Sequence, residues 1–544
     1  MANIYARLNL ASSIFPFYTE AAGRTIMIPE QDSNWDRYNA ASTVQDKGVP
    51  QVFYMHNVMP IAGGFQSIGY EQKIAGLPGH TDFDYAYPFR NSNLSRFIFV
   101  PAQGANYIYD MEVGAWASVN PIPSTSVPHQ ILVTTASVNG QTYLYYYQAG
   151  CFQYNDTTKL LAPVTLTGLD TTQVLGITAV NGYMVAWTAT TIAWSSLTDP
   201  TNFTPSVQTG AGGGNVQDAK GAITICLPIS GGFIIYCEQN AVGASYTGNT
   251  SFPFIILGIP NAGGCYNQQQ IASQTNLGAH IAYTTAGIQS IGLNSANNIM
   301  PEVTDFLAAN LYEDFDETTL AITQAYLSVP VACQFTSIGA RYIVVSYGLP
   351  GMPFEYAIVF DAVLNRYGKL KIPHVSCFEW NNPADYGATT YGELLNDGIV
   401  YGGISPLTIY EDWFQLAQTI EIPKQNMAFL GQDGTIQVVV FGLSEVGADG
   451  IFILGKLQLR RSQVIVHQRT DIESVPYYAN FSLSLLPTYD GKDFTAAIPA
   501  VPRYSTALVR SFAKRVTGQN ISLLFQGAFN LTSVVVNFTL GGWR

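Results

Sequence analysis

The chain has few charged side chains: Lys, Arg, Asp and Glu make up 11% of its 544 residues. An average soluble domain has about 25%. Disordered proteins combine high charge with few aromatic residues, whereas this chain is 47% hydrophobic and 13% aromatic, so it is predicted to fold. A surface this poor in charge indicates that partner proteins cover part of it.

The charges that are present are unevenly distributed. Residues 1–439 contain 14 Lys and Arg against 31 Asp and Glu, a net charge of −17, and residues 440–544 contain 10 against 6, a net charge of +4. A protein that grips nucleic acid needs clustered Lys and Arg, so the acidic part is not expected to hold DNA. An acidic wall past which DNA slides remains compatible with these numbers.

Cysteine and histidine are scarce and lack metal-binding spacing. The six Cys form no CxxC pair, and the six His, at positions 56, 80, 129, 280, 374 and 467, form no HxH or HExxH motif. A hairpin centred on Gly231-Gly232 would place Cys226 opposite Cys237. We expect two buried thiols there, with a disulfide as the alternative. The sequence therefore predicts no metal and no cofactor.

Catalytic patterns are also missing. The chain has no GxSxG motif and no Cys beside a His, and GAGGG (210–214) lacks the Lys-Ser/Thr of a phosphate loop, so we expect a flexible loop there. Asp82 and Asp84, next to Tyr85 and Tyr87, would share one strand face; this pair fits a solvated face better than a glycosidase or Ca²⁺ site. The acidic run YEDFDE (312–317) is interpreted as a solvated or partner-facing loop. We predict that the protein is not an enzyme.

Long apolar runs are absent. No stretch of 18 apolar residues occurs, so no membrane span is predicted. The first ten residues, MANIYARLNL, contain one Arg and no apolar run of seven, so we expect no secretory signal peptide.

Short strand-forming runs dominate what remains. Examples are QTYLYYYQAG (141–150), RYIVVSYG (341–348) and LTSVVVNFTL (531–540), rich in β-branched and aromatic residues and flanked by turn formers. Helical spacing is clearest in VTDFLAANLYEDF (303–315), with Thr304 as the expected N-cap. Many short strands separated by turns predict an all-β fold.

Three segments share the plan of a strand, a turn and an aromatic residue. YIYDMEVGAWA (107–117) and IVFDAVLNRYGK (358–369) each end a strand in Asp, at Asp110 and Asp361, with an aromatic residue six positions later. TTIAWSSLTDPTNFTP is a variant, in which Trp194 and Phe203 flank a turn at Asp199-Pro200. Aromatic residues between twisted sheets are typical of a β-propeller, so we expect packing roles for Trp194 and Phe203.

The composition of the chain changes near residue 430. After this point the chain is more basic, and its runs of alternating apolar and polar residues, typical of strands, are longer. We therefore predict three parts: residues 1–60 as an N-terminal segment that contributes to a platform, residues 61–430 as a β-propeller with inserted loops, and residues 431–544 as an all-β platform domain.

Several segments in one order resemble the tail nozzle proteins, of tail tubular protein B type, of short-tailed bacteriophages. The similar segments are PQVFYMHNVMPIAGGFQSIGYE (50–71), IAWSSLTDPTNFTPS (192–206), residues 231–271 with their Phe-Pro and Gly-Cys pairs, IAYTTAGIQSI (281–291), YDGKDF, and the last strands up to the terminal GGWR. Together they extend over most of the chain.

The resemblance implies a structural virion protein of the tail, assembled in the host cytoplasm. Six copies would form a ring below the tail adaptor, each with a β-propeller, and the ring would close and then conduct the DNA channel during genome ejection. The implied partners are further copies of the chain, the tail adaptor, tail fibres or spikes, and viral DNA that passes without specific binding.

The basic C-terminal part suggests where the ring docks. The candidate docking residues are Arg460, Arg461, Arg510, Lys514 and Arg515, which would meet an acidic surface of the adaptor or of a neighbouring subunit; solvated strand ends are the alternative. Two other functions stay open: a carbohydrate-binding or depolymerising tail protein, and an extracellular propeller that binds a ligand as a monomer.

Overall fold

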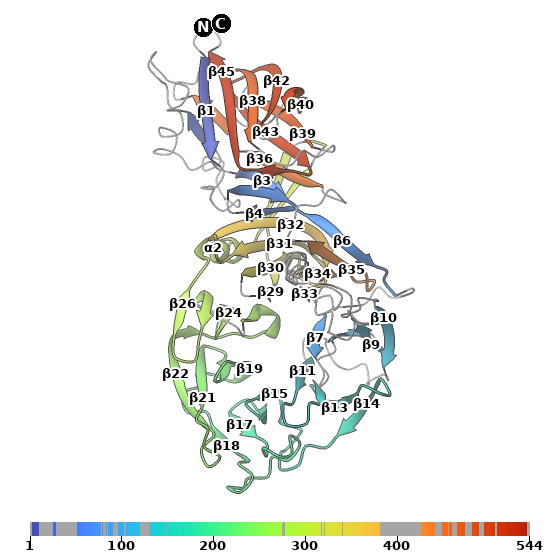
Figure 1. Ribbon diagram of the computed structural model, residues 1–544. Coiled ribbons are helices and arrows are strands. Elements are labelled where there is room, and N and C mark those ends of the chain that lie inside the picture. Colours follow the sequence, from blue (N-terminus) through green and yellow to red (C-terminus); the bar gives the residue numbers. More distant parts are fainter. Residues whose placement is uncertain are drawn as a thin grey trace, which may run out of the picture.

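Nearly every element of the computed structural model is a β-strand, and most strands form four-stranded antiparallel sheets, which confirms the predicted β-propeller. The described residues are 3–9, 25–28, 52–61, 63–77, 79, 83, 85–90, 96–102, 105–111, 113–119, 131–147, 149–274, 278–316, 318–319, 321–339, 341–380, 426–440, 449–454, 456–459, 465–473, 481–488, 494, 496–505 and 509–540. Figure 1 shows the propeller as a ring of sheets, with a smaller platform on its rim.

The first four blades follow one another along the chain, each starting at the inner strand. Blade 1 contains β7 (Tyr87–Arg90), β8 (Arg96–Ala102), β9 (Ala105–Asp110) and β10 (Ala115–Val119). Blade 2 contains β11 (Ile131–Thr135), β12 (Thr142–Tyr146), β13 (Gly150–Asn155) and β14 (Leu160–Val164). Blade 3 contains β15 (Gly176–Val180), β16 (Tyr183–Trp187), β17 (Thr191–Trp194) and β18 (Gly212–Asn215). Blade 4 contains β19 (Ile223–Ile229), β20 (Gly232–Cys237), β21 (Asn240–Tyr246) and β22 (Phe254–Gly263).

Of the remaining three blades, the last takes its outer strand from the start of the chain. After the 3₁₀ turn η4 (Gln268–Gln270), blade 5 contains β23 (Ile271–Gln274), β24 (Ala279–Thr284), β25 (Gly287–Ile291) and β26 (Ala296–Asn298). Blade 6 contains β29 (Ala332–Ile338), β30 (Tyr342–Gly348), β31 (Phe354–Asp361) and β32 (Arg366–His374). Blade 7 contains β33 (Ser376–Trp380), β34 (Asn426–Leu430) and β35 (Ile436–Val440), and its outer strand is β6 (Gly69–Ile74). The described residues thus form seven blades, the last of which is completed by an N-terminal strand.

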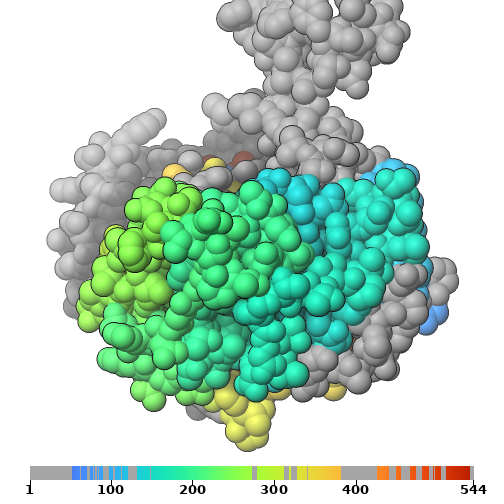
Figure 2. Space-filling model, turned by 90° about the horizontal axis from the view of Figure 1, so that it is seen from below, coloured from blue at the N-terminus to red at the C-terminus, as the bar shows by residue number. Residues whose placement is uncertain are grey.

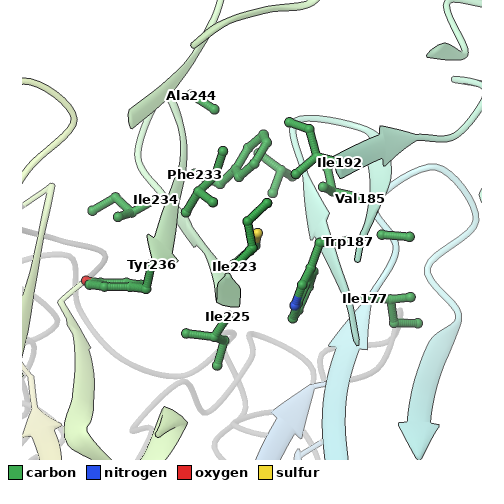
Figure 3. Packing of buried hydrophobic residues seen from close by; sticks show 14 of the residues in the cluster. Ile177, Val185, Trp187, Ile192, Ile223, Ile225, Phe233, Ile234, Tyr236 and Ala244 are labelled. Carbon is green, nitrogen blue, oxygen red and sulfur yellow. The ribbon is translucent and has the colours of Figure 1, made fainter. Parts of the chain in front are cut away.

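The hydrophobic core is a ring of clusters between neighbouring blades. One cluster extends from blade 2 to blade 5 and includes Trp187, Phe203 and Phe233. Figure 3 shows Trp187 and Phe233 within it. The ring closes where Tyr109 of blade 1 packs in one cluster with Trp380 of blade 7. Burial of these faces against each other is the main force that holds separate four-stranded sheets in one ring.

The proposed Asp repeat occupies the same place in two blades. Asp110 and Asp361 each end the third strand of a blade, and the carboxylate accepts hydrogen bonds from backbone N–H groups of the following turn. The fourth turn residue has positive φ in both, at Gly114 (70°) and Asn365 (52°), which is the left-handed conformation that these residue types tolerate. Blade 2 has the same turn after Asn155, a copy that the sequence analysis missed.

Two sheets at the rim form the platform, a β-sandwich. One sheet contains β1 (Asn3–Asn9), β45 (Ser533–Leu540), β38 (Ile465–Glu473), β42 (Val509–Gly518) and β41 (Val501–Ser505). The other contains β2 (Thr25–Ile28), β37 (Lys456–Leu459), β43 (Asn520–Gly527), β36 (Gly450–Leu454), β3 (Val52–His56), β39 (Ser482–Thr488) and β40 (Ile498–Pro499). Phe452 and Phe525 of one sheet and Phe512 and Phe538 of the other meet in a shared core.

The platform and the propeller are continuous. The chain passes from β3 into β4 (Val58–Ile61) and β5 (Gly64–Ser67), and these strands, with β44 (Asn530–Leu531), extend blade 6 into one seven-stranded sheet (Figure 1). The predicted boundary at residues 430 and 431 is wrong, because β35 pairs with β34 and β6 in the last blade. The platform strands from the C-terminal part begin at β36 instead.

The predicted helix is shorter and begins earlier than expected. Helix α2 covers Pro301–Ala308, because Pro301 favours the first helical position; Met300 is the N-cap, with φ of 51°. Thr304 is therefore no cap, and its hydroxyl oxygen instead accepts a hydrogen bond from the Ile288 N–H. The acidic run that follows is not a loop: β27 (Leu311–Asp316) forms a hairpin with β28 (Ala321–Tyr326).

Two further expectations concern blades 3 and 4. The predicted flexible loop at 210–214 is wrong for its second half, since Gly212–Asn215 is the outer strand of blade 3. Cys226 lies opposite Ile235 rather than Cys237, because the hairpin turns at Ser230-Gly231 and Gly231 takes the positive φ of 84°. Both thiols are free and buried, as expected.

Candidate functional site

Three of the five predicted docking residues lie on strand β42, and Arg460 and Arg461 lie outside the described residues. Lys514 and Arg515 are both exposed although they are consecutive, because the pairing of β42 with β38 shifts register at this point. Arg510 is half-buried, with its guanidinium over the Phe481 and Phe512 rings at 5.4 and 4.9 Å. Its contacts belong to the platform, so the exposed pair carries the docking hypothesis.

Tyr85 and Tyr87 do not form an exposed aromatic surface. Their rings are 4.6 Å apart, and Tyr87 is buried. Burial raises the pKa of Tyr85 to about 12, against a smaller opposite effect of its hydrogen bond to Gln334 of blade 6. The two tyrosines pack between blades and are therefore no exposed aromatic platform, and the solvated face predicted for Asp82 and Asp84 stays a prediction. The neighbouring Asp82 and Asp84 lie outside the described residues.

Three buried histidines have structural partners. His280 contacts the Tyr236 hydroxyl at 3.0 Å and the Pro228 carbonyl at 2.9 Å; His374 and His467 each bridge a backbone carbonyl and a hydroxyl. Desolvation lowers the pKa of each to about 4, so all three are neutral at pH 7. No group of three or more His, Cys, Asp or Glu side chains within the described ranges is arranged to hold a metal ion.

The junction between platform and propeller contains two buried cations on strand β32. The Lys369 ammonium lies over the Tyr54 ring of the platform at 4.6 Å and over the Tyr356 ring of blade 6 at 4.4 Å. The Arg366 guanidinium lies over the Phe65 ring at 4.5 Å and donates a hydrogen bond to the Ile61 carbonyl at 2.8 Å. Burial lowers the pKa of Arg366 to about 10. Cation–π contacts are strongest when water is excluded, as it is here.

A buried amide completes this junction. Asn57, at the turn from β3 to β4, accepts a hydrogen bond from the Lys371 N–H at 2.9 Å and donates one to the Asp449 carboxylate at 2.8 Å. One side chain thus connects blade 6 with the C-terminal part of the platform. Desolvation raises the pKa of Asp449.

An open hollow lies between blades 2, 3 and 4, at the face that carries the β12–β13 turn and the connection from β22 to β23. Its volume is about 390 Å³, within the range of small-molecule sites. We call it the inter-blade hollow; it is lined by Leu132, Tyr147, Leu175, Trp187, Thr224, Ile225, Tyr266, Asn267 and Gln268. None of these residues is marked by a pattern in the sequence, because they come from three blades and share no spacing.

Large apolar side chains are exposed on the outer part of blade 4. Phe252 is 71% exposed, and Ile255 and Leu257 follow on one side of β22 at 54% and 58%. Figure 2 shows the rim opposite the platform, where blades 2 to 4, coloured cyan to green, form the visible surface. These three exposed apolar side chains form a candidate contact surface for another molecule.

Comparison with known proteins adds only likenesses of structure. No family model matches the chain, and no curated protein matches it. Among solved structures, the WD40 β-propeller domain of Doa1 is similar with 10% identity and a TM-score of 0.37, over 70% of this chain and 98% of that one. The extracellular domain of a hybrid two component system from B. thetaiotaomicron is similar with 11% identity and a TM-score of 0.35, over 77% of this chain and 47% of that one. Among the described residues, no helix is long and apolar enough to cross a membrane.

Proposed function

We propose that this protein is a structural subunit of a viral tail nozzle, which assembles into a hexameric ring that closes and then conducts the DNA channel. The observation that carries the proposal is the extension of the blade 6 sheet by β4, β5 and β44, whose residues Val58, Phe65 and Leu531 lie in the core cluster of the platform. A ring that resists a packaged genome has to transmit force between its parts without bending at a linker, and a blade sheet that packs into the platform core does this.

The buried contacts of the junction support the same function. Lys369 and Arg366 lie over rings of the N-terminal strands, and Asn57 bonds both to blade 6 and to Asp449. Moving the platform relative to the propeller would expose these rings and leave buried polar groups without their partners, which costs about 1–3 kcal/mol for each group. The two parts therefore act as one rigid body.

The surface also favours assembly. The exposed Phe252, Ile255 and Leu257 offer an apolar contact area, and the chain has few charges to oppose association. The net charge of −17 over residues 1–439 suits a channel wall that repels phosphates, so that DNA passes without binding.

The experiment is to image the purified full chain by negative-stain electron microscopy and to measure its mass in solution at several concentrations. A six-fold ring supports the nozzle proposal. A trimeric spike would favour a receptor-binding tail protein, and a monomer at all concentrations would contradict ring assembly without a partner. Adding a purified tail adaptor, if the chain alone is monomeric, decides whether that partner is required; a chain that stays monomeric with it is not a nozzle subunit.

A further inference from the structure

The inter-blade hollow has no charged side chain among the residues that line it. A charged ligand would lose part of its hydration there without gaining an opposite charge, which is unfavourable. A ligand of this hollow is therefore neutral.

The lining combines apolar and polar parts. Leu132, Leu175 and Ile225 provide apolar surface from three blades, and Trp187, which is 1% exposed, also borders the hollow. The connection after β22 adds Tyr266, whose side chain is 64% exposed and so presents an aromatic ring to solvent at the hollow. An aromatic ring placed in this way stacks well on a second flat, weakly polar surface.

Two amide side chains stand next to that ring. The Asn267 side-chain oxygen accepts a hydrogen bond from the Gln269 N–H at 3.0 Å, which fixes the amide at the start of η4. Within the described part of the chain no protein acceptor is found for the Asn267 amide nitrogen or partner for the Gln268 amide, so both keep hydrogen-bonding capacity for a ligand. The Thr224 hydroxyl hydrogen is already directed at the Tyr236 and Cys265 carbonyl oxygens, so toward a ligand this hydroxyl can only accept.

We propose that the inter-blade hollow binds a neutral saccharide unit. A pyranose ring has one face of C–H groups, which would lie on Tyr266 and the apolar lining, and equatorial hydroxyls, which would exchange hydrogen bonds with Asn267 and Gln268. Its lack of charge fits the uncharged lining. The site is complete within one chain, so this proposal is independent of ring assembly and of the nozzle function.

The test uses the full chain and isothermal titration calorimetry with methyl glycosides of glucose, galactose and N-acetylglucosamine and with their disaccharides. Glucuronic acid and adenosine serve as a charged sugar and a flat neutral non-sugar. The informative variants are Tyr266→Ala and Gln268→Ala, both at exposed or half-exposed positions. Their matched controls are Phe252→Ala, an exposed aromatic residue outside the hollow, and Gln269→Ala, the neighbour of Gln268 that does not line it.

We expect saturable binding of at least one neutral saccharide, weakened about tenfold by Tyr266→Ala, the effect of losing one aromatic contact, and measurably by Gln268→Ala. The two control variants are expected to bind as the unmodified chain does. The proposal is overturned if no neutral saccharide binds up to its solubility limit, if Tyr266→Ala binds as tightly as Phe252→Ala, or if glucuronic acid or adenosine binds more tightly than every neutral sugar.

Discussion

Two tryptophans of blade 3 provide a sharp test of how the blades pack. Trp187 is 1% exposed within the largest core cluster (Figure 3). Its indole N–H is buried and has no hydrogen-bond partner among the described residues. Trp194 is only half-buried, and its N–H donates to the Gly210 carbonyl at 2.9 Å. The same substitutions at the two positions should therefore have different effects.

For Trp187→Ala we expect a loss of about 3–5 kcal/mol in the free energy of unfolding, the cost of truncating a fully buried Trp. Trp187→Phe removes part of the ring and leaves a small cavity, but it also removes a buried donor whose lack of a partner costs about 1–3 kcal/mol. These two effects nearly cancel, so Trp187→Phe should change stability by less than about 1 kcal/mol. Trp194→Phe has no such compensation, because it leaves the Gly210 carbonyl without its donor, and should cost about 0.5–1.5 kcal/mol.

The measurement is thermal unfolding by far-UV circular dichroism at one scan rate, so that the four variants Trp187→Ala, Trp187→Phe, Trp194→Ala and Trp194→Phe are ranked under identical conditions. The expected order places Trp187→Ala lowest and Trp187→Phe close to the unmodified chain. If Trp187→Phe melts as early as Trp187→Ala, the indole N–H stabilises the fold and our account of this core is wrong. Trp194→Ala should lie above Trp187→Ala, since a half-buried side chain has less area to lose.

Three further outcomes follow from the same structure. His280, His374 and His467 have folded-state pKa values near 4, below the unfolded value of about 6.5. The stability that they contribute is present above pH 6.5 and is lost as the pH falls toward 4, so the melting temperature should fall over that window, and a flat profile would contradict it. Lys369→Met should lower the melting temperature, because it removes two cation–π contacts worth about 1–2 kcal/mol each when desolvated. Limited proteolysis of the same variant detects any separation of platform and propeller. If the melting temperature and the cleavage pattern are both unchanged, the ammonium does not hold the junction. Lys514→Glu with Arg515→Glu should fold normally but attach poorly, at low salt, to tailless particles that carry the adaptor, and normal attachment would remove β42 as the docking surface.

The strands and the recurring turns were largely predictable because their signals are local. Alternation and β-branched residues mark strands such as β12, β30 and β45, and the Asp before each four-residue turn bonds within its own loop. The predictions that failed concern positions whose local structure depends on a neighbouring residue. A turn displaced by one residue, at Ser230-Gly231, changed the partner of Cys226, and Pro301 moved the start of the helix.

Contacts between residues that are far apart in the sequence could not be predicted. Lys369 stands in an alternating segment, YGKLKIPH, in which a lysine is expected to point to solvent. It is buried between Tyr356 and Tyr54, and Tyr54 is far away in the sequence. The inter-blade hollow has the same origin, since its lining comes from separate blades and one connection. The domain boundary was misplaced for this reason too, because β35 is assigned by pairing with the N-terminal β6 and not by its own composition.

Because β6 completes blade 7, the two paired strands of this blade, β6 and β35, are synthesised at very different times. Strand β6 leaves the ribosome long before β35, its partner in the sheet. At roughly 5–20 residues per second, the intervening 360 or so residues take about 20–70 s to make. During that interval β6 has an unpaired edge, which is a template for wrong pairing. A nascent chain that stops before residue 436 lacks β35 and cannot close the ring by this pairing, so truncated products should aggregate. Slower translation should lower the yield of closed propellers, and a chaperone that covers β4 to β6 should raise it.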